Sequence, residues 1–370
     1  MSALKTLFWN VKTRDRKASL SFTKAPTEDK LFEVTNEAVD GPECLQDCST
    51  CTIKYPAKFS IDETEKLYGH VKGWSTHLIV GTGKSDWVRD VADEKGSVME
   101  AVDKGDVKAV NGKLMLSASN MPRPDHCDYP NNTHETPSTV LLLPAFTLID
   151  NVTPSTVPDL ITHFVNAGPT NTTPLAHNSI PALPVDSPLR SRPCPHDYLI
   201  LLCSQKTRDA RCGQSAPLLR REFERHLRPL GMYRDLTDER PGGVGIYFIS
   251  HVGGHKFSAN VMIYRRAGMG RESVHERKTS VVEEENAGTA TSENGVKAVP
   301  AVTMGEDDPS VETPAVVEAS REAGQCIWLA RVRPEDCENI IRYTVLQGKV
   351  VKPQSQLRGG FDRERQLTSW

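Results

Sequence analysis

No long apolar run occurs in this sequence. Its 370 residues are 38% hydrophobic and 25% charged, and none of its apolar stretches approaches the roughly 18–20 residues of a membrane-spanning helix. The opening residues also lack the continuous apolar segment of a secretory signal. We therefore expect a protein without a membrane span.

An excess of positive charge is missing as well. The formal net charge is −3, so the composition gives no support to a nucleic-acid partner. Only the start of the chain is basic, because Asp15 is the single acidic residue among the first 24. Such a start fits a disordered segment of a cytoplasmic protein, and a presequence for the mitochondrial matrix is the alternative.

Cysteine is present, but in a form that argues against a disulfide framework. The nine cysteines are an odd number in a large chain without a visible secretory signal. This combination favours metal binding or redox chemistry over structural disulfides.

The alternation of strand and helix patterns predicts an α/β fold with two domains. A segment rich in Pro, Asn, Thr and Ser separates the domains, and an acidic segment without periodicity interrupts the second one. The predicted parts are a disordered basic start (1–40), an N-terminal α/β domain (41–167), a linker (168–193), a thioredoxin-like domain (194–266 and 324–352), a disordered acidic insertion (267–323) and a C-terminal tail (353–370).

The second domain has the pattern of a thioredoxin-like fold. Its elements follow the order strand, helix, strand, strand, insertion, strand, helix. The first helix is expected over 215–231, with Ser215 as its cap and Pro217 in its first turn. The last helix is expected over 334–348.

The stretch HVGGH, residues 251–255, places two histidines around two glycines. A helix is disfavoured there, since each glycine costs about 1 kcal/mol relative to alanine. The flanking residues have the pattern of strands, so we expect the tight turn of a β-hairpin. Gly253 and Gly254 would supply the positive φ that such a turn requires.

Two cysteines complete a possible metal site. Cys203 ends the first strand of the second domain, and Cys212 follows it nine residues later, just before the expected helix. Both should lie at the sheet edge that the histidine turn can reach. Two thiolates and two imidazoles fit tetrahedral zinc, and they also fit a [2Fe–2S] cluster, in which histidine can replace cysteine on iron. The donor types alone do not decide between the two.

Three segments carry a resemblance to a known family. LLCSQKTRDARCG, GVGIYFISHVGGHKFSANVMIY and IWLARVRP together resemble the sucrase/ferredoxin-like family. The resemblance implies a thioredoxin-like ferredoxin whose [2Fe–2S] cluster is held by Cys203, Cys212, His251 and His255. It further implies a non-enzymatic electron carrier in cytosolic redox homeostasis, with a donor and an acceptor protein that the sequence does not identify.

Histidine ligation would change the chemistry of such a cluster. Two neutral imidazoles in place of two thiolates make the cluster less negative, which raises its potential toward roughly −150 to +300 mV. Each imidazole also keeps a second N–H, so we expect proton coupling and a potential that falls as pH rises. The alternatives are a structural zinc-binding interaction module and an oxidoreductase that uses the N-terminal cysteines.

Those N-terminal cysteines, Cys44, Cys48 and Cys51, have the spacing Cys-x₃-Cys-x₂-Cys. A radical-SAM [4Fe–4S] site has this spacing, but the chain lacks the repeated strands of the barrel in which such sites occur. We interpret the three as a secondary site, either a labile thiol pair or an exposed metal-binding patch.

The chain ends in Trp370, an aromatic ring beside a free carboxylate. Ser369 and Trp370 resemble the C-terminal signal read by the cytosolic iron–sulfur targeting complex, although Thr368 stands where that signal has an apolar residue. We predict that Trp370 binds this partner, and a frayed terminus is the alternative.

Overall fold

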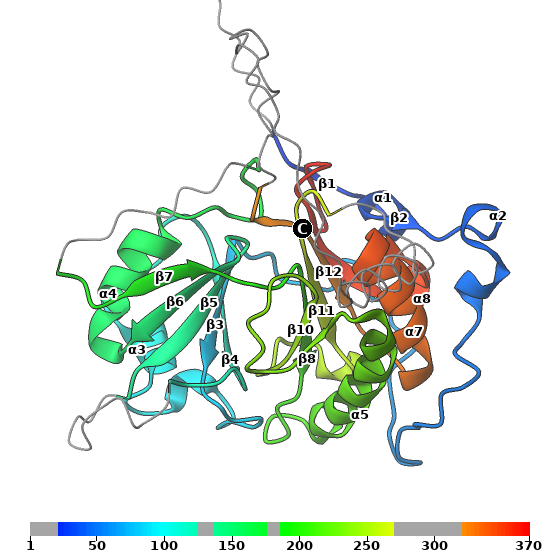
Figure 1. Cartoon of the computed structure of the whole chain (residues 1–370), viewed down its shortest axis with the longest axis horizontal. Coiled ribbons are helices and arrows are strands. Elements are labelled where there is room, and N and C mark those ends of the chain that lie inside the picture. The colour runs from blue at the N-terminus through cyan, green and yellow to red at the C-terminus, as the bar shows by residue number, and fades with distance from the viewer. Residues whose placement is uncertain (1–20, 125–135, 176–185, 270–319) are drawn as a thin grey trace, which may run out of the picture.

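The computed structural model describes residues 21–124, 136–175, 186–269 and 320–370. In these ranges the chain is a mixed α/β protein built on one sheet of 13 strands (Figure 1), which confirms the predicted fold class. The sheet has the order β1-β15-β14-β12-β11-β8-β10-β4-β3-β5-β6-β7, and β9 pairs with β10 beside this path. A small second sheet joins β13 and β2.

The N-terminal half begins with short elements and continues with a set of longer strands. The short elements are β1 (Thr23–Lys24), α1 (Glu28–Leu31), β2 (Glu33–Val34), α2 (Glu37–Asp40) and η1 (Pro42–Leu45). The following elements are β3 (Thr76–Gly81), η2 (Val91–Asp93), α3 (Val98–Lys104), β4 (Leu114–Ser119), β5 (Ser138–Leu143), β6 (Thr147–Val152), η4 (Pro154–Thr156), α4 (Val157–Asp159), the π-helical η5 (Leu160–Val165) and β7 (Arg190–Pro193).

The C-terminal half contains the longest helix of the described residues. Its elements are β8 (Tyr198–Cys203), α5 (Ala210–Leu227), η6 (Arg228–Leu230), β9 (Tyr233–Arg234), β10 (Val244–Ile249), η7 (His255–Phe257), β11 (Val261–Arg266), β12 (Ala323–Leu329), η8 (Pro334–Asp336), α7 (Cys337–Asn339), the π-helical η9 (Ile340–Val345), β13 (Lys349–Val350), α8 (Pro353–Gln356), β14 (Leu357–Asp362) and β15 (Leu367–Thr368).

The two halves repeat one arrangement. In the C-terminal half β8 is parallel to β10 and antiparallel to β11, which is antiparallel to β12. This is the predicted thioredoxin-like order. In the N-terminal half β3, β4, β5 and β6 have the same mutual directions. Each half also places a helix between its first two strands and a helical segment with a π-helical part after its fourth.

The halves join where β4 pairs antiparallel with β10 through Ser119 and Ile249. Gly81 of β3 pairs with Ser119, and Cys203 of β8 pairs with Ile249, so these four residues form one row across the sheet. Each of them is the last residue of its strand. The carboxyl ends of the parallel strands of both halves therefore meet at this seam.

Alternation along the strands explains the three main apolar clusters. Residues such as Leu78 and Ile200 face the helices of their own half, in two separate clusters. The alternate residues of these strands face the other side of the sheet. Ile79, Leu199 and Tyr264 lie there, in one cluster shared by both halves. Strands buried on both faces have continuous apolar sequences for this reason.

The predicted start of one helix is wrong. The first helix of the C-terminal half begins at Ala210, and Asp209 caps it by accepting a hydrogen bond from the Arg211 N–H. Ser215 and Pro217 therefore lie inside the helix, and Cys212 lies in its first turn.

The segment HVGGH is also no hairpin turn, because β8 lies between β10 and β11 in the sheet. The histidines belong to a long connection that passes over the end of β8. The positive φ values expected for its glycines are confirmed, at 85° for Gly253 and 69° for Gly254.

Several predicted segments fall wholly or partly outside the described residues. Residues 1–20, 176–185 and 270–319 do so, which covers much of the expected basic start, linker and acidic insertion. Of the expected tail, residues 357–362 form β14, which pairs with β12 inside the sheet. Among the described residues, no helix is long and apolar enough to cross a bilayer.

Candidate metal centre

Two thiols meet at the carboxyl end of β8. Cys203 is the last residue of that strand, and its backbone N–H donates to the Asn260 carbonyl at 3.2 Å. Cys212 is the third residue of α5. Both side chains are buried, and their sulfur atoms lie 3.4 Å apart. Two thiolates on one tetrahedral metal lie about 3.8 Å apart, so the pair needs little movement to share an ion.

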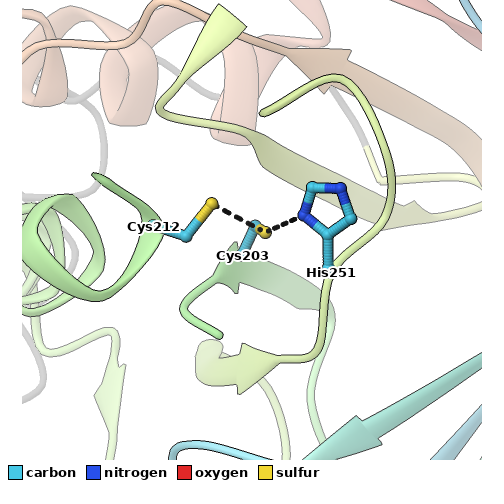
Figure 2. A group of neighbouring side chains, drawn as sticks. All are labelled: Cys203, Cys212 and His251. Carbon is cyan, nitrogen blue, oxygen red and sulfur yellow. Dashed lines mark hydrogen bonds between the residues drawn. The ribbon is translucent and has the colours of Figure 1, made fainter. Parts of the chain in front are cut away.

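His251 approaches the same point from β10. Because β8 and β10 are parallel, their carboxyl ends meet at one edge, and His251 follows β10 by two residues. Its Nδ1 atom lies 3.7 Å from the Cys203 sulfur (Figure 2). The backbone of His255 opens η7, while its side chain lies outside the described part of the structure. Three of the four predicted ligands are thus brought together.

The two thiols titrate as a pair. The Cys203 thiol donates a hydrogen bond to Cys212, and this bond, helped by His251, lowers the pKa of Cys212 to about 5. The same bond, together with burial, raises the pKa of Cys203 well above its ordinary value. The hydrogen bond therefore favours a thiolate on Cys212 rather than on Cys203, and a thiolate suits a site for a cation.

Gln205 fixes the site to the N-terminal half. Its Oε1 accepts the His251 backbone N–H at 2.9 Å, and its Nε2 donates to the Val88 carbonyl at 2.5 Å. Beside it, the Ser204 hydroxyl donates to the Ser85 carbonyl at 3.0 Å. The loop of residues 85–89 therefore holds both the start of the cysteine loop and the start of the histidine segment.

Arg358, on β14, holds the glycines of the histidine segment. It is 4% exposed, and its guanidinium donates to the Gly253 carbonyl at 2.9 Å, to Asn260 Oδ1 at 2.9 Å and to the His70 carbonyl at 3.1 Å. It also stacks over the Trp328 ring at 4.2 Å. Burial lowers its pKa to about 10, so Arg358 is a cation near the thiols at neutral pH.

A cavity of about 650 Å³ borders the histidine segment. His251 and Arg358 form part of its wall, together with Trp74 and the exposed Lys72 and Lys113 from the N-terminal half. The half-buried imidazole is therefore reachable from solvent on a side where the charged lining is basic.

Gln205, Asn260 and Arg358 were not found by sequence reasoning. Gln205 could have been suspected from the sequence, since it lies between the two cysteines. No sequence pattern indicates Asn260 or Arg358, because their role depends on contacts across the sheet.

The donor set fits a soft or borderline metal. Thiolates and imidazoles suit zinc and iron–sulfur clusters, whereas magnesium and calcium need oxygen ligands. The residues at the site therefore fit either of the two groups considered from the sequence.

The N-terminal cysteines do not converge on one point. Cys44 is buried against Tyr343 and Val351. Burial raises its pKa. Cys48 and Cys51 are half-buried on the following turn, where the Cys51 N–H donates to the Cys48 carbonyl at 3.2 Å. In the described ranges, no group of donor atoms that could share a metal contains all three.

Trp370 lies against the body of the protein. Its ring centroid is 4.6 Å from that of Trp74, at an interplanar angle of 35°. The ring is partly buried in the cluster shared by both halves.

Comparisons with known proteins bear on the whole arrangement. A family model described as sucrase/ferredoxin-like matches residues 67–359. Actin patches distal protein 1 of Saccharomyces cerevisiae is 31% identical over 252 residues, which cover 63% of this chain and 75% of the yeast protein.

Two further relatives share the name altered inheritance of mitochondria protein 32. The protein of Clavispora lusitaniae is 25% identical over 176 residues, 47% of this chain and 40% of that protein. The protein of Meyerozyma guilliermondii is 38% identical over 72 residues, 20% of this chain and 23% of that protein. The chain thus spans less than half of either one. No solved structure matches the chain.

Proposed function

The chain belongs to the sucrase/ferredoxin-like family, and from this premise we propose that it is an electron carrier with one [2Fe–2S] cluster. The cluster would be held by Cys203, Cys212, His251 and His255. The observation that supports this is the meeting of two buried thiols and an imidazole at one sheet edge, with sulfur–sulfur and sulfur–nitrogen distances of 3.4 and 3.7 Å.

A cluster bound there would take up and release one electron. The protein's own part is to hold the donors and set their charge. Gln205 orients the His251 backbone, and Arg358 places a buried positive charge beside the glycines. With two imidazoles as ligands, the potential would lie in the histidine-ligated range rather than near −400 mV. The remaining imidazole N–H groups would couple electron uptake to a proton.

We propose a carrier rather than an enzyme, with a donor protein and an acceptor protein as its partners. The wall formed by His251, Lys72 and Lys113 offers the basic approach that an acidic partner would use. We place the protein in the cytoplasm. The alternative is the mitochondrial matrix, and imaging of the tagged full chain decides between the two.

For Trp370 we propose binding by the cytosolic iron–sulfur targeting complex. Its packing on Trp74 means that a partner must first draw the ring away from the body. Deletion of Trp370 should lower cluster occupancy in cells and leave reconstitution of the purified protein unchanged. A purely structural role of the ring predicts an equal loss in both.

A structural zinc module is the second candidate. The donor atoms of Cys203, Cys212 and His251 all lie within 4.8 Å of one another, which also suits a single ion.

The deciding experiment is an absorption and EPR spectrum of the anaerobically purified full chain. His251→Ala and Cys212→Ala are measured beside it, with Cys44→Ala as a control outside the site. The cluster predicts a red-brown protein that is EPR-active only when reduced, with altered signals in the two site variants alone. A colourless protein with one zinc lost in both variants would replace the electron carrier by the zinc module.

A further inference from the structure

A second group of side chains that could bind a metal lies at the C-terminal end of α5, whose first turn carries Cys212. It combines Cys48 from the N-terminal segment, His226 from the end of α5 and Glu338 from α7. One donor atom from each residue lies within 4.8 Å of the other two, and Cys48 Sγ is 3.8 Å from His226 Nε2. The three are half-buried and come from segments far apart in the sequence.

The hydrogen bonds around these atoms show which way their lone pairs point. The Arg225 guanidinium lies 3.4 Å from Cys48 Sγ and 2.9 Å from His226 Nε2. A guanidinium has donors only, so both atoms accept from it; for His226 this requires the tautomer with its proton on Nδ1, although Nε2 also lies 3.3 Å from Glu222 Oε1. The positively charged guanidinium of Arg225 therefore contacts both donor atoms, in the position that a bound metal ion would take.

Arg225 can leave this position without leaving a buried carboxylate unpaired. Its side chain is 41% exposed, and its Nε atom separately donates to the buried Glu222 at 3.0 Å. The outer guanidinium nitrogen also donates to Glu222, so a divalent ion that displaces this nitrogen from the sulfur and the imidazole would leave Glu222 with the bond from Nε alone.

We propose that Cys48, His226 and Glu338 form a zinc site, with solvent as the fourth ligand. One thiolate, one imidazole and one carboxylate are donors that zinc accepts in tetrahedral sites. Cys48 lies outside the residues matched by the family model, and the site shares no residue with the proposed cluster.

The site would fasten the N-terminal segment to the helices of the C-terminal half. The segment already docks there, since the Asn339 side chain donates to the carbonyls of Glu43, Cys44 and Gln46. The Cys48 N–H also donates to the Glu335 carbonyl at 3.0 Å. An ion bound across these segments stabilises the docked state, because the undocked segment offers only part of the ligand set.

The test measures zinc and iron together in the full chain. After equilibration with zinc and removal of the excess, we expect one zinc per chain. Cys48→Ser and His226→Gln should lose this zinc and keep their iron, while Cys203→Ser should lose iron and keep zinc. His163→Gln, in η5 of the N-terminal half, is the matched control and should keep both. If the Cys203 site holds zinc instead of a cluster, the wild type should carry two zincs and no iron, of which Cys48→Ser and His226→Gln lose one and Cys203→Ser loses the other, so the two proposals fail separately.

A second variant tests the site without removing a ligand. Arg225→Met, made in a Glu222→Gln background so that no buried carboxylate is left unpaired, removes the competing cation, so zinc affinity measured against a chromophoric chelator should rise at least tenfold over that background. With cobalt in place of zinc, a sulfur-to-metal charge-transfer band should form and be absent in Cys48→Ser. Equal zinc content in wild type and Cys48→Ser, or no gain of affinity in Arg225→Met, would overturn the proposal.

Discussion

Replacing Arg358 by Met should loosen the candidate metal centre far more than it destabilises the fold. The lowered pKa of this buried arginine corresponds to a cost of about 3 kcal/mol for keeping the charge inside. Its three hydrogen bonds offset this cost, at about 1.5–3 kcal/mol each for a charged donor. The native arrangement is therefore favourable overall.

In Arg358→Met all three acceptors lose their arginine donor, but they differ in the donors that remain to them. Asn260 Oδ1 keeps the Trp328 indole N–H as a donor at 3.2 Å, and the exposed His70 leaves its carbonyl open to water. The Gly253 carbonyl loses the side-chain donor that fixes its position. With the burial cost of the charge removed, we expect a loss of only about 2 kcal/mol in the free energy of unfolding. The histidine segment, in contrast, loses the side chain that holds its glycines.

Urea unfolding and the release of bound metal to a chelator separate the two effects. We expect metal release from Arg358→Met to be at least tenfold faster than from the wild type, which corresponds to about 1.4 kcal/mol at the segment. Arg358→Lys keeps the charge but cannot make the same fork of bonds, so it should fall between the two. Lys72→Met, an exposed cation of the same cavity, is the control and should change neither measurement. Unchanged release from a destabilised Arg358→Met would show that the arginine serves packing alone.

Three further predictions concern other parts of the molecule. Burial lowers the pKa of His77 to about 3, so the folded state binds fewer protons than the unfolded state below pH 6.5, and stability falls as pH drops. Between pH 7 and 5 we expect His77 to cost about 2 kcal/mol, and urea titrations of His77→Gln should show a correspondingly smaller pH dependence; an equal dependence would contradict this. A Cβ on Gly254 would lie 2.6 Å from the Arg358 guanidinium, whereas one on Gly253 would lie 3.8 Å away. Gly254→Ala should therefore release metal faster than Gly253→Ala, and the reverse order would refute the role of Arg358 in holding these glycines. The composition of residues 270–319 predicts disorder, so replacing them by a Gly/Ser linker of about six residues should raise stability by about 2 kcal/mol through the smaller entropic cost of loop closure, with metal content unchanged; a loss of metal would mean that these residues support the site.

The strands of the C-terminal half were predictable because they are short apolar runs between turn residues. Their neighbours in the sheet were not. The hairpin prediction for β10 and β11 failed because consecutive strands need not be adjacent, and β8 lies between these two. The predicted start of α5 was wrong because a serine followed by a proline two residues later is a pattern typical of a helix start, as at Ser215 and Pro217. The residue that caps the helix is Asp209.

The donor residues of the candidate site could be predicted from the sequence, but the residue that holds the histidine segment in place could not. Cys203, Cys212 and His251 could be assigned to one edge, because the ends of parallel strands meet there. Arg358 could not, since it lies about a hundred residues beyond the glycines it holds, in a segment expected to be a tail. The residues near Cys48 were not predictable for the same reason, because the distant helices α5 and α7 supply them.

The seam between β4 and β10 makes the chain resemble a dimer of one topology joined into a single polypeptide. The second strand of one half pairs antiparallel with the second strand of the other, as two identical subunits related by a twofold axis would do. Under this pseudosymmetry Gly81 stands where Cys203 stands, because both occupy the same row. One copy of the architecture thus carries the thiol and the other carries only a glycine. The thiol is therefore no requirement of the fold, since the same arrangement of strands forms around a glycine at the equivalent place.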